Sequence, residues 1–291
     1  MYCLVVFAWV LAQEGAVSQF PKLLIEGPPE FASIRTRLES MEPERFADIA
    51  RLLGVTEAGL PIQVILANEN SNFARSVSSW IAGFAVGESN LVVVFPTRSP
   101  SYPSRTFDDV VRHEIAHVLI RRASGGEPVP RWFNEGLSMV VERQRRFADQ
   151  TQLLYQLMSG SRTSLDQIDR LFSGGQNDQT RGYALAGAFV HDLLERYGAD
   201  SGAEILMRVR RGAAFNDAVR ETTGATLGAM EAEFWKRQRI WTRWVPIIGS
   251  STTLWLAVTF LALLAIYRRR RRNREIEERW EKEDDAGPTP P

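Results

Sequence analysis

The sequence predicts an α+β fold in which a small mixed β-sheet packs on a helix that carries His113-Glu114-Ile115-Ala116-His117. A mainly helical C-terminal half and one transmembrane helix follow. Three observations predict this order. Two short apolar runs with β-branched residues, 61–67 and 90–95, precede the histidine helix. Apolar residues with helical spacing fill 151–235. The uncharged stretch 246–267 is long enough to cross a bilayer.

The first third of the chain alternates helical and strand patterns. Residues 28–54 open with two prolines and continue with apolar residues at helical spacing, so we expect one or two helices there. The run 61–67 is short and partly alternating, which is typical of a strand. A second strand is expected at 90–95, where Pro96 ends the run.

The histidine helix has recognisable ends. A loop rich in serine and proline, 97–105, leads into it. Thr106 and Asp109 have the spacing of a capping box, which satisfies the free backbone N–H groups at a helix start. Gly125 and Gly126 are placed to close the helix. We therefore expect a helix between these signals.

His113 and His117 stand four residues apart in a chain that has only 3 histidines. On a helix this spacing places both imidazoles on one face, where they can bind a single metal ion. Glu114 stands beside them, and a carboxylate there can take a proton from a metal-activated water and pass it to a leaving amine. This pattern favours a zinc site with hydrolytic chemistry. The alternative, a pair of hydrogen-bonded core histidines, would leave the downstream run Trp132-Phe133-Asn134-Glu135-Gly136 unexplained.

Catalytic zinc needs a third protein ligand, and we expect Glu135 to supply it from a second helix, 130–142. Gly136 lowers helix propensity, which makes sense if this helix packs closely against the histidine helix. Glu142 lies two turns later on the same face and could hydrogen-bond the far nitrogen of a ligand histidine, or lie at the surface. His191 is expected to be a surface or packing histidine.

His113-Glu114-x-x-His117 followed by Trp132-Phe133-Asn134-Glu135-Gly136 resembles the gluzincin zinc metallopeptidases. This group includes thermolysin-like and aminopeptidase-N-like enzymes and the small peptidase MA-like domains. The resemblance covers two helices, 106–146. It implies that His113, His117 and Glu135 bind one zinc ion, Zn²⁺, and that Glu114 is the general base for a zinc-activated water that hydrolyses a peptide bond.

The resemblance has three further implications. A tyrosine in the position of Tyr183 would hydrogen-bond the oxyanion of the transition state, although it could also be an aromatic packed under the cleft. The strand Leu91–Phe95 would lie at the edge of the cleft and pair with an extended substrate, or be an ordinary sheet strand. Residues 87–90 depart from the segment by which aminopeptidases hold a free amine, so an endopeptidase is favoured.

The C-terminal half is expected to be helical from Thr151 to Trp235, with Gly174-Gly175 and Gly198 separating helices. One of these helices is expected to begin at Tyr183 and to run to Tyr197. Residues 281–291 are rich in charge and proline, which is typical of disorder.

Both chain ends predict a membrane protein. Trp241 and Trp244 precede the uncharged stretch and Tyr267 ends it, where aromatic rings favour the bilayer interface. Five arginines, 268–272, follow and favour the cytoplasmic side. The alternative is a buried core helix. The apolar residues 1–12 resemble a short signal peptide.

The predicted organisation is a signal peptide at 1–12, a gluzincin-like ectodomain at 13–244, a transmembrane helix at 245–267, and a cytoplasmic tail at 268–291 that is basic and then disordered. The protein would be a single-pass cell-membrane protein with its catalytic domain extracytoplasmic. Its formal net charge of +0 gives no reason to expect a nucleic-acid partner. The one cysteine, Cys3, lies in the leader, which leaves the redox compartment open.

The sequence therefore predicts a membrane-anchored zinc metallopeptidase that acts on a peptide or protein substrate. Two alternatives stay open: a non-catalytic membrane scaffold stabilised by zinc, and a zinc hydrolase of a non-peptide substrate. Substrate identity and oligomeric state cannot be read from the sequence.

Overall fold

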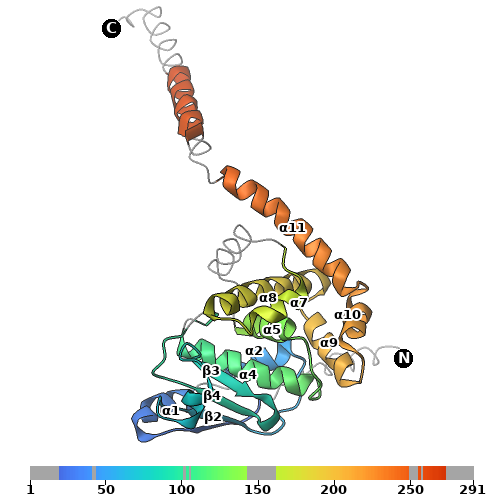
Figure 1. The fold of residues 1–291 in the computed structure, drawn as a ribbon. Coiled ribbons are helices and arrows are strands. Elements are labelled where there is room, and N and C mark those ends of the chain that lie inside the picture. The colour runs from blue at the N-terminus through green and yellow to red at the C-terminus, as the bar shows by residue number, and fades with distance from the viewer. Residues whose placement is uncertain are drawn as a thin grey trace, which may run out of the picture. The chain divides into compact units, whose positions relative to one another are not determined.

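The computed structural model describes residues 20–40, 44–100, 103–104, 106–142, 162–248, 255–256 and 258–272. The chain divides into two units, Met1–Trp235 and Lys236–Pro291. In the described part of the chain, all strands and the histidine helix belong to the first unit. This unit is α+β, as the sequence predicts (Figure 1).

The sheet contains β1 (Leu23–Glu26), β2 (Ile62–Leu66), β3 (Gly83–Val86) and β4 (Leu91–Val94), in the spatial order β1-β2-β4-β3. Strands β1, β2 and β4 are parallel, and β3 runs antiparallel to β4. The sheet is therefore small and mixed. β2 and β4 confirm the two strands that the sequence predicts. β1 and β3 are not predicted, because neither contains the run of β-branched residues that marks β2 and β4.

Strand β4 lies inside the sheet, so Leu91–Phe95 does not form the edge of the cleft, and the alternative of an ordinary sheet strand is confirmed. Val92 pairs with Val64 of β2 on one side and with Ala85 of β3 on the other. Val92, Val93 and Val94 are all 0% exposed, as expected of a strand covered on both faces. The edge strand on this side of the sheet is β3, a strand that the sequence analysis did not predict.

Helix α4 (Phe107–Ala123) carries the histidines and lies between the sheet and α5 (Arg131–Glu142). The Thr106 side chain accepts from the Asp109 backbone, and the Asp109 side chain accepts from the Thr106 backbone, so the predicted capping box is confirmed. Gly125 and Gly126 follow with φ of 69° and 87°, which is the left-handed backbone that glycine favours. Sheet and helices thus hold α4 at the centre of the unit (Figure 1).

Helix α8 (Gln176–Tyr197) packs against α5 and begins two turns before Tyr183. The expectation that the helix starts at Tyr183 is therefore wrong. Residues 176–180 are polar, so they do not show the apolar periodicity by which a buried helix is recognised, yet they form its first turns. This early start places several polar side chains on the same helix as Tyr183.

One large apolar cluster runs through the first unit, from Phe31 to Trp235. The 28–54 segment forms two α-helices, as predicted. The other elements are η1 (Pro29–Phe31), α1 (Ala32–Glu39), α2 (Glu44–Leu52), α3 (Asn72–Ser76), η2 (Gly87–Ser89), α7 (Leu165–Leu171), α9 (Ser201–Arg210), α10 (Phe215–Thr223) and α11 (Leu227–Ile248).

Several predicted segments fall outside the described residues: the signal peptide at 1–12, the helical pattern at 151–161 and the tail at 273–291. The predicted transmembrane stretch 246–267 is described only in part, since 249–254 and 257 are outside it. Among the helices in the described part of the chain, none has both the length and the apolar character needed to span a bilayer. Residues 258–272 are helical, and their side chains are exposed.

Candidate active site and metal centre

His113 and His117 lie one turn apart on α4 and direct their Nε2 atoms toward each other. The two nitrogens are 3.2 Å apart, and the rings are perpendicular, with an interplanar angle of 90°. His113 is buried and His117 is partly buried. The helix spacing therefore presents two nitrogen donors at one point.

Glu135 on α5 brings a carboxylate to the same point. Its Oε2 atom lies 3.5 Å from His113 Nε2 and 3.3 Å from His117 Nε2. The ligand atoms of these three residues all lie within 4.8 Å of one another. The structure thus brings together the three residues that the sequence predicts as metal ligands.

This triangle fits a tetrahedral metal ion. Zinc bonds of about 2.0–2.2 Å in a tetrahedral arrangement place neighbouring ligand atoms about 3.3–3.6 Å apart, and the three edges here are 3.2, 3.3 and 3.5 Å. Oε2 of Glu135 is buried and receives no hydrogen bond from any described residue. A buried carboxylate oxygen with no donor is costly, and a cation would satisfy it. The donor set of two imidazoles and one carboxylate is compatible with zinc.

Two side chains of α5 contact the His117 ring at Nδ1, the nitrogen that faces away from the metal centre. Nδ1 of His117 lies 2.9 Å from Oδ1 of Asn134 and 3.1 Å from Oγ of Ser138. With Nε2 directed at the metal centre, Nδ1 carries the proton and donates it, which fixes the tautomer and the ring. We did not predict these partners, although Asn134 belongs to the motif and Ser138 lies one turn after it. The side chain of Glu142, for which the sequence left a histidine partner and a surface position open, is outside the described part of the structure.

The buried groups of the centre perturb one another. Burial alone would raise the pKa of Glu135, but the two imidazoles hold it well below its usual range, so the carboxylate is ionised. Burial alone would lower the pKa of His117, but the Glu135 carboxylate outweighs this effect and raises it. Glu135 is therefore in the ionised state in which a carboxylate can bind a cation.

Close packing of α5 on α8 places Glu135. A Cβ atom at Gly136 would lie 2.5 Å from the backbone oxygen of Ala186 and 2.6 Å from Cγ2 of Val190, both on α8. The expectation that Gly136 allows close packing is therefore right, but the partner helix is α8 and not α4. At the start of α5, the Trp132 backbone N–H donates to Oδ1 of Asp169 on α7, at 2.5 Å. These contacts fix the position of the helix that carries Glu135.

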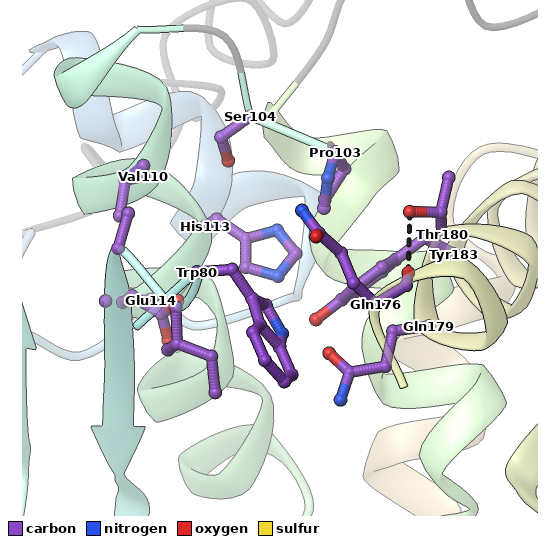
Figure 2. Close-up of a pocket in the computed structure, with 13 residues that line it drawn as sticks. Trp80, Pro103, Ser104, Val110, His113, Glu114, Gln176, Gln179, Thr180 and Tyr183 are labelled. Atoms are coloured by element: carbon purple, nitrogen blue, oxygen red, sulfur yellow. Dashed lines mark hydrogen bonds between the residues drawn. The ribbon is translucent and has the colours of Figure 1, made fainter. Parts of the chain in front are cut away.

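A pocket of about 60 Å³ opens beside the centre (Figure 2). Glu114 lines it from α4, next to Gly83 of the edge strand β3, whose added Cβ would lie 3.1 Å from Glu114 Cγ. Trp80 lines it from the loop before β3, and the first turns of α8 line the opposite wall. Glu114 thus faces the same open space as His113, where a water and a substrate can meet.

Tyr183 projects from α8 into this pocket (Figure 2). Its ring centroid lies 6.1 Å from that of His113 and 5.1 Å from that of Phe172. The ring of Tyr183 therefore packs against neighbouring aromatic rings, and the same side chain also lines the pocket. His191 is farther along α8, 43% exposed and 3.7 Å from Glu195, so the expectation of a surface histidine is confirmed.

The sequence model of the Peptidase MA superfamily matches residues 45–240. The chain belongs to the Peptidase MA superfamily. The matched region contains α4, α5 and the three residues of the metal centre. No curated protein matches the chain.

Membership in the Peptidase MA superfamily identifies the first unit as a metallopeptidase-like domain. The cluster of His113, His117 and Glu135 agrees with this assignment, because it is compatible with the metal ion that a metallopeptidase uses. Trp80 and the polar turns of α8 are pocket residues that the sequence interpretation missed. No short sequence motif indicates these residues, because they are far from the histidine motif in the chain and come close to it only when the chain folds.

Proposed function

We propose that this chain is a membrane-anchored zinc metallopeptidase of the gluzincin type, and that it acts as an endopeptidase. The observation that carries the proposal is the convergence of His113, His117 and Glu135 beside a pocket that Glu114 lines. Superfamily membership supports the hydrolase class. The ligand geometry supports zinc.

The residues of the centre have separate roles in this proposal. His113, His117 and Glu135 hold the zinc ion. When bound, zinc supplies a Lewis acid that polarises a carbonyl and lowers the pKa of water. Glu114 removes the proton from the attacking water and delivers it to the leaving amine. Asn134 and Ser138 keep the proton of His117 at Nδ1. Tyr183 donates a hydrogen bond to the oxyanion that forms at the scissile carbonyl.

The edge strand β3 supports a peptide substrate. It lies at the end of the sheet beside Glu114, and one side of its backbone is free of any described strand. An extended peptide can pair with such an edge through backbone hydrogen bonds, with little dependence on its sequence. In our proposal β3 takes the role that the sequence interpretation gave to Leu91–Phe95.

Glu88 is the carboxylate of residues 87–90, the segment that departs from the amine-binding segment of aminopeptidases, and its position favours an endopeptidase. The side chain is 81% exposed and lies 3.3 Å from Arg121. It does not line the pocket, where Glu114 is the one carboxylate among the described lining residues. A free amino terminus would therefore find no second carboxylate there to bind it. Internal peptide bonds are the substrates that this arrangement favours.

Membrane anchoring rests on the second unit. The described apolar side chains between 255 and 267 are exposed, including Trp255 at 68% and Phe260 at 65%. Arg268–Arg272 follow directly. Exposed apolar side chains next to a basic run are expected where a helix meets a bilayer and its cytoplasmic surface. We place the catalytic unit outside the cytoplasm and the tail inside it.

The roles of base and ligand can be separated by substitution. Glu114→Gln should keep zinc and lose at least about a hundredfold in peptide hydrolysis, because the amide cannot accept the proton. His113→Ala, His117→Ala and Glu135→Ala should lose the metal itself. Metal content and cleavage of a quenched fluorescent peptide library give the two measurements, with His191→Ala as a control.

Two outcomes would contradict the proposal. Undiminished hydrolysis by Glu114→Gln would remove Glu114 from the base role. A fully zinc-loaded wild-type protein without chelator-sensitive turnover of any peptide would favour a zinc-stabilised scaffold or a hydrolase of another bond. The termini of the products distinguish internal cleavage from trimming.

A further inference from the structure

Trp80 occupies a particular place in the pocket. It lies in the turn between α3 and β3, where the Ile81 backbone N–H donates to the Ser78 carbonyl at 3.0 Å. Its indole ring stands between Glu114 on α4 and Gln179 on α8 (Figure 2). The side chain is only partly buried. Part of its side chain therefore remains accessible beside Glu114.

A nearly buried arginine holds this turn from outside the pocket. Nη1 of Arg98 donates to the carbonyl of Ser78 at 3.1 Å and to the carbonyl of Ile81 at 2.7 Å. These two carbonyls flank Trp80 in the chain. The Arg98 side chain is 6% exposed. One rigid guanidinium thus fixes both ends of the short segment that carries the indole.

Arg98 is itself held by two further contacts. Its Nε and Nη2 atoms lie 2.9 Å from the two carboxylate oxygens of Glu69, which forms a bidentate pair. Its guanidinium carbon lies 3.9 Å above the ring of Phe95, in cation–π geometry. Glu69 follows β2 and Arg98 follows β4, so the clamp connects the ends of two parallel strands to the Trp80 turn. None of these contacts involves the metal centre.

The wall opposite Trp80 is polar but uncharged. Gln176, Gln179 and Thr180 line it from the first turns of α8. Among the described lining residues, His113 and Glu114 are the only ones with a titratable acid or base besides Tyr183. Apart from Glu114, whose carboxylate is used by the proposed reaction, no described lining side chain offers a carboxylate, lysine or arginine as a counter-ion. A charged substrate side chain packed against this wall would lose water, whereas an apolar ring would cover the indole.

We propose that Trp80 is a specificity-determining residue that accepts an aromatic or large apolar side chain next to the scissile bond, and that Arg98 is its positioning residue. This inference rests on the proposed peptidase function. It assigns the substrate preference to the Trp80 turn, which lies outside the metal motif. Glu69 acts through Arg98.

Binding can be measured without turnover. Full-length Glu114→Gln protein loaded with zinc is titrated with blocked Gly-Gly-X-Gly-Gly peptides in which X is Phe, Leu, Asp or Lys. The Phe and Leu peptides should bind more tightly than the Asp and Lys peptides. Adding Trp80→Ala should reduce the affinity for the Phe peptide about tenfold and leave that for the Asp peptide unchanged. Trp80→Phe should restore most of the preference.

Kinetics test the positioning role. Arg98→Lys keeps the charge but loses the forked contacts, so KM for the Phe peptide should rise with kcat little changed. Arg75→Lys is the matched control, because Arg75 lies on neighbouring α3 and donates hydrogen bonds to the Asn70 carbonyl and the Asn72 side chain, away from the Trp80 turn. Zinc content and thermal unfolding verify that each variant is folded and loaded.

The possible results separate the two proposals. An unchanged Phe-to-Asp ratio in a folded, active Trp80→Ala protein overturns the inference and leaves the peptidase function intact. An Arg98→Lys variant that lowers kcat with KM constant overturns the positioning role. A Trp80-dependent preference in binding, without cleavage by the wild-type protein, supports the recognition site while the peptidase proposal fails.

Discussion

Asn134 and Ser138 show how single side chains complete the metal centre. Both approach Nδ1 of His117, at 2.9 and 3.1 Å, and both come from the helix that supplies Glu135. In the proposed metal centre, one residue of α5 is a ligand, while its neighbours orient a second ligand on α4. This arrangement couples the position of the imidazole on α4 to that of α5.

The orientation of His117 predicts a loss of zinc affinity. Asn134→Ala removes the nearer acceptor and should weaken zinc binding by about 10–100-fold. Ser138→Ala should have a smaller effect, since Asn134 remains. Competition with a chromophoric chelator measures both affinities, and His191→Ala serves as the surface control. Equal affinities for the wild type and for Asn134→Ala would show that the hydrogen bond does not support the metal.

Glu69 predicts a pH effect at the Arg98 clamp. The hydrogen bond from Arg98 is the main cause that lowers the pKa of Glu69 from 4.5, against a smaller opposing effect of desolvation. A carboxyl with a lowered folded-state pKa stabilises the protein above its unfolded pKa and loses that contribution as pH falls through the folded value. Glu69→Gln should therefore be less stable than the wild type at pH 7, and the difference should shrink below about pH 4.

Urea unfolding at neutral and acid pH measures this difference. A gap between wild type and Glu69→Gln that stays constant down to pH 3 would mean that the carboxylate charge does not hold the clamp. Asp217→Asn is a suitable control, because Asp217 pairs with Arg220 at the exposed surface of α10, 2.9 Å away.

At the scale of elements, the contact between α5 and α8 decides where Glu135 lies. Gly136→Ala should destabilise the fold by about 1–2 kcal/mol, because the methyl group meets the Ala186 carbonyl, and this overpacking exceeds the gain in helix propensity. Zinc affinity should fall as well, since Glu135 is the adjacent residue. Denaturant unfolding and chelator competition give the two values.

Gly228→Ala is the matched control. Gly228 lies in α11, and an added Cβ would meet nothing within 4 Å. This substitution should cause no loss and should stabilise the protein by up to about 1 kcal/mol. If the Gly136→Ala protein is as stable as the Gly228→Ala protein, α5 and α8 can move apart without a loss in the free energy of unfolding.

At the scale of the whole molecule, the local motif was predictable and its surroundings were not. Two histidines one turn apart and a glutamate on the following helix depend only on helix geometry, so spacing was enough to predict the cluster. The partner of Gly136, the start of α8 and the edge position of β3 depend on which segments pack together. These contacts join residues far apart in the chain, and local periodicity does not encode them.

The second unit predicts the behaviour of the full chain in cells. The full-length protein should stay with membranes through an alkaline carbonate wash, because a spanning helix resists extraction. A chain that lacks residues 245–291 should be released, yet it should keep zinc and its thermal stability, since the metal centre belongs to the first unit. Release of the full-length protein by carbonate would contradict the anchor.

The burial of helix α4 has a consequence for how the protein would acquire a metal ion. Apolar residues on several sides of it are fully enclosed, among them Ile115, Val118 and Leu119 at 0% exposure. Burial of this kind holds the helix whether or not a cation is present, unlike a zinc finger, which unfolds without its metal. Amide hydrogen exchange along α4 should therefore stay slow after dialysis against a chelator. The newly made polypeptide can then fold first and bind the metal ion afterwards, in whichever compartment supplies it.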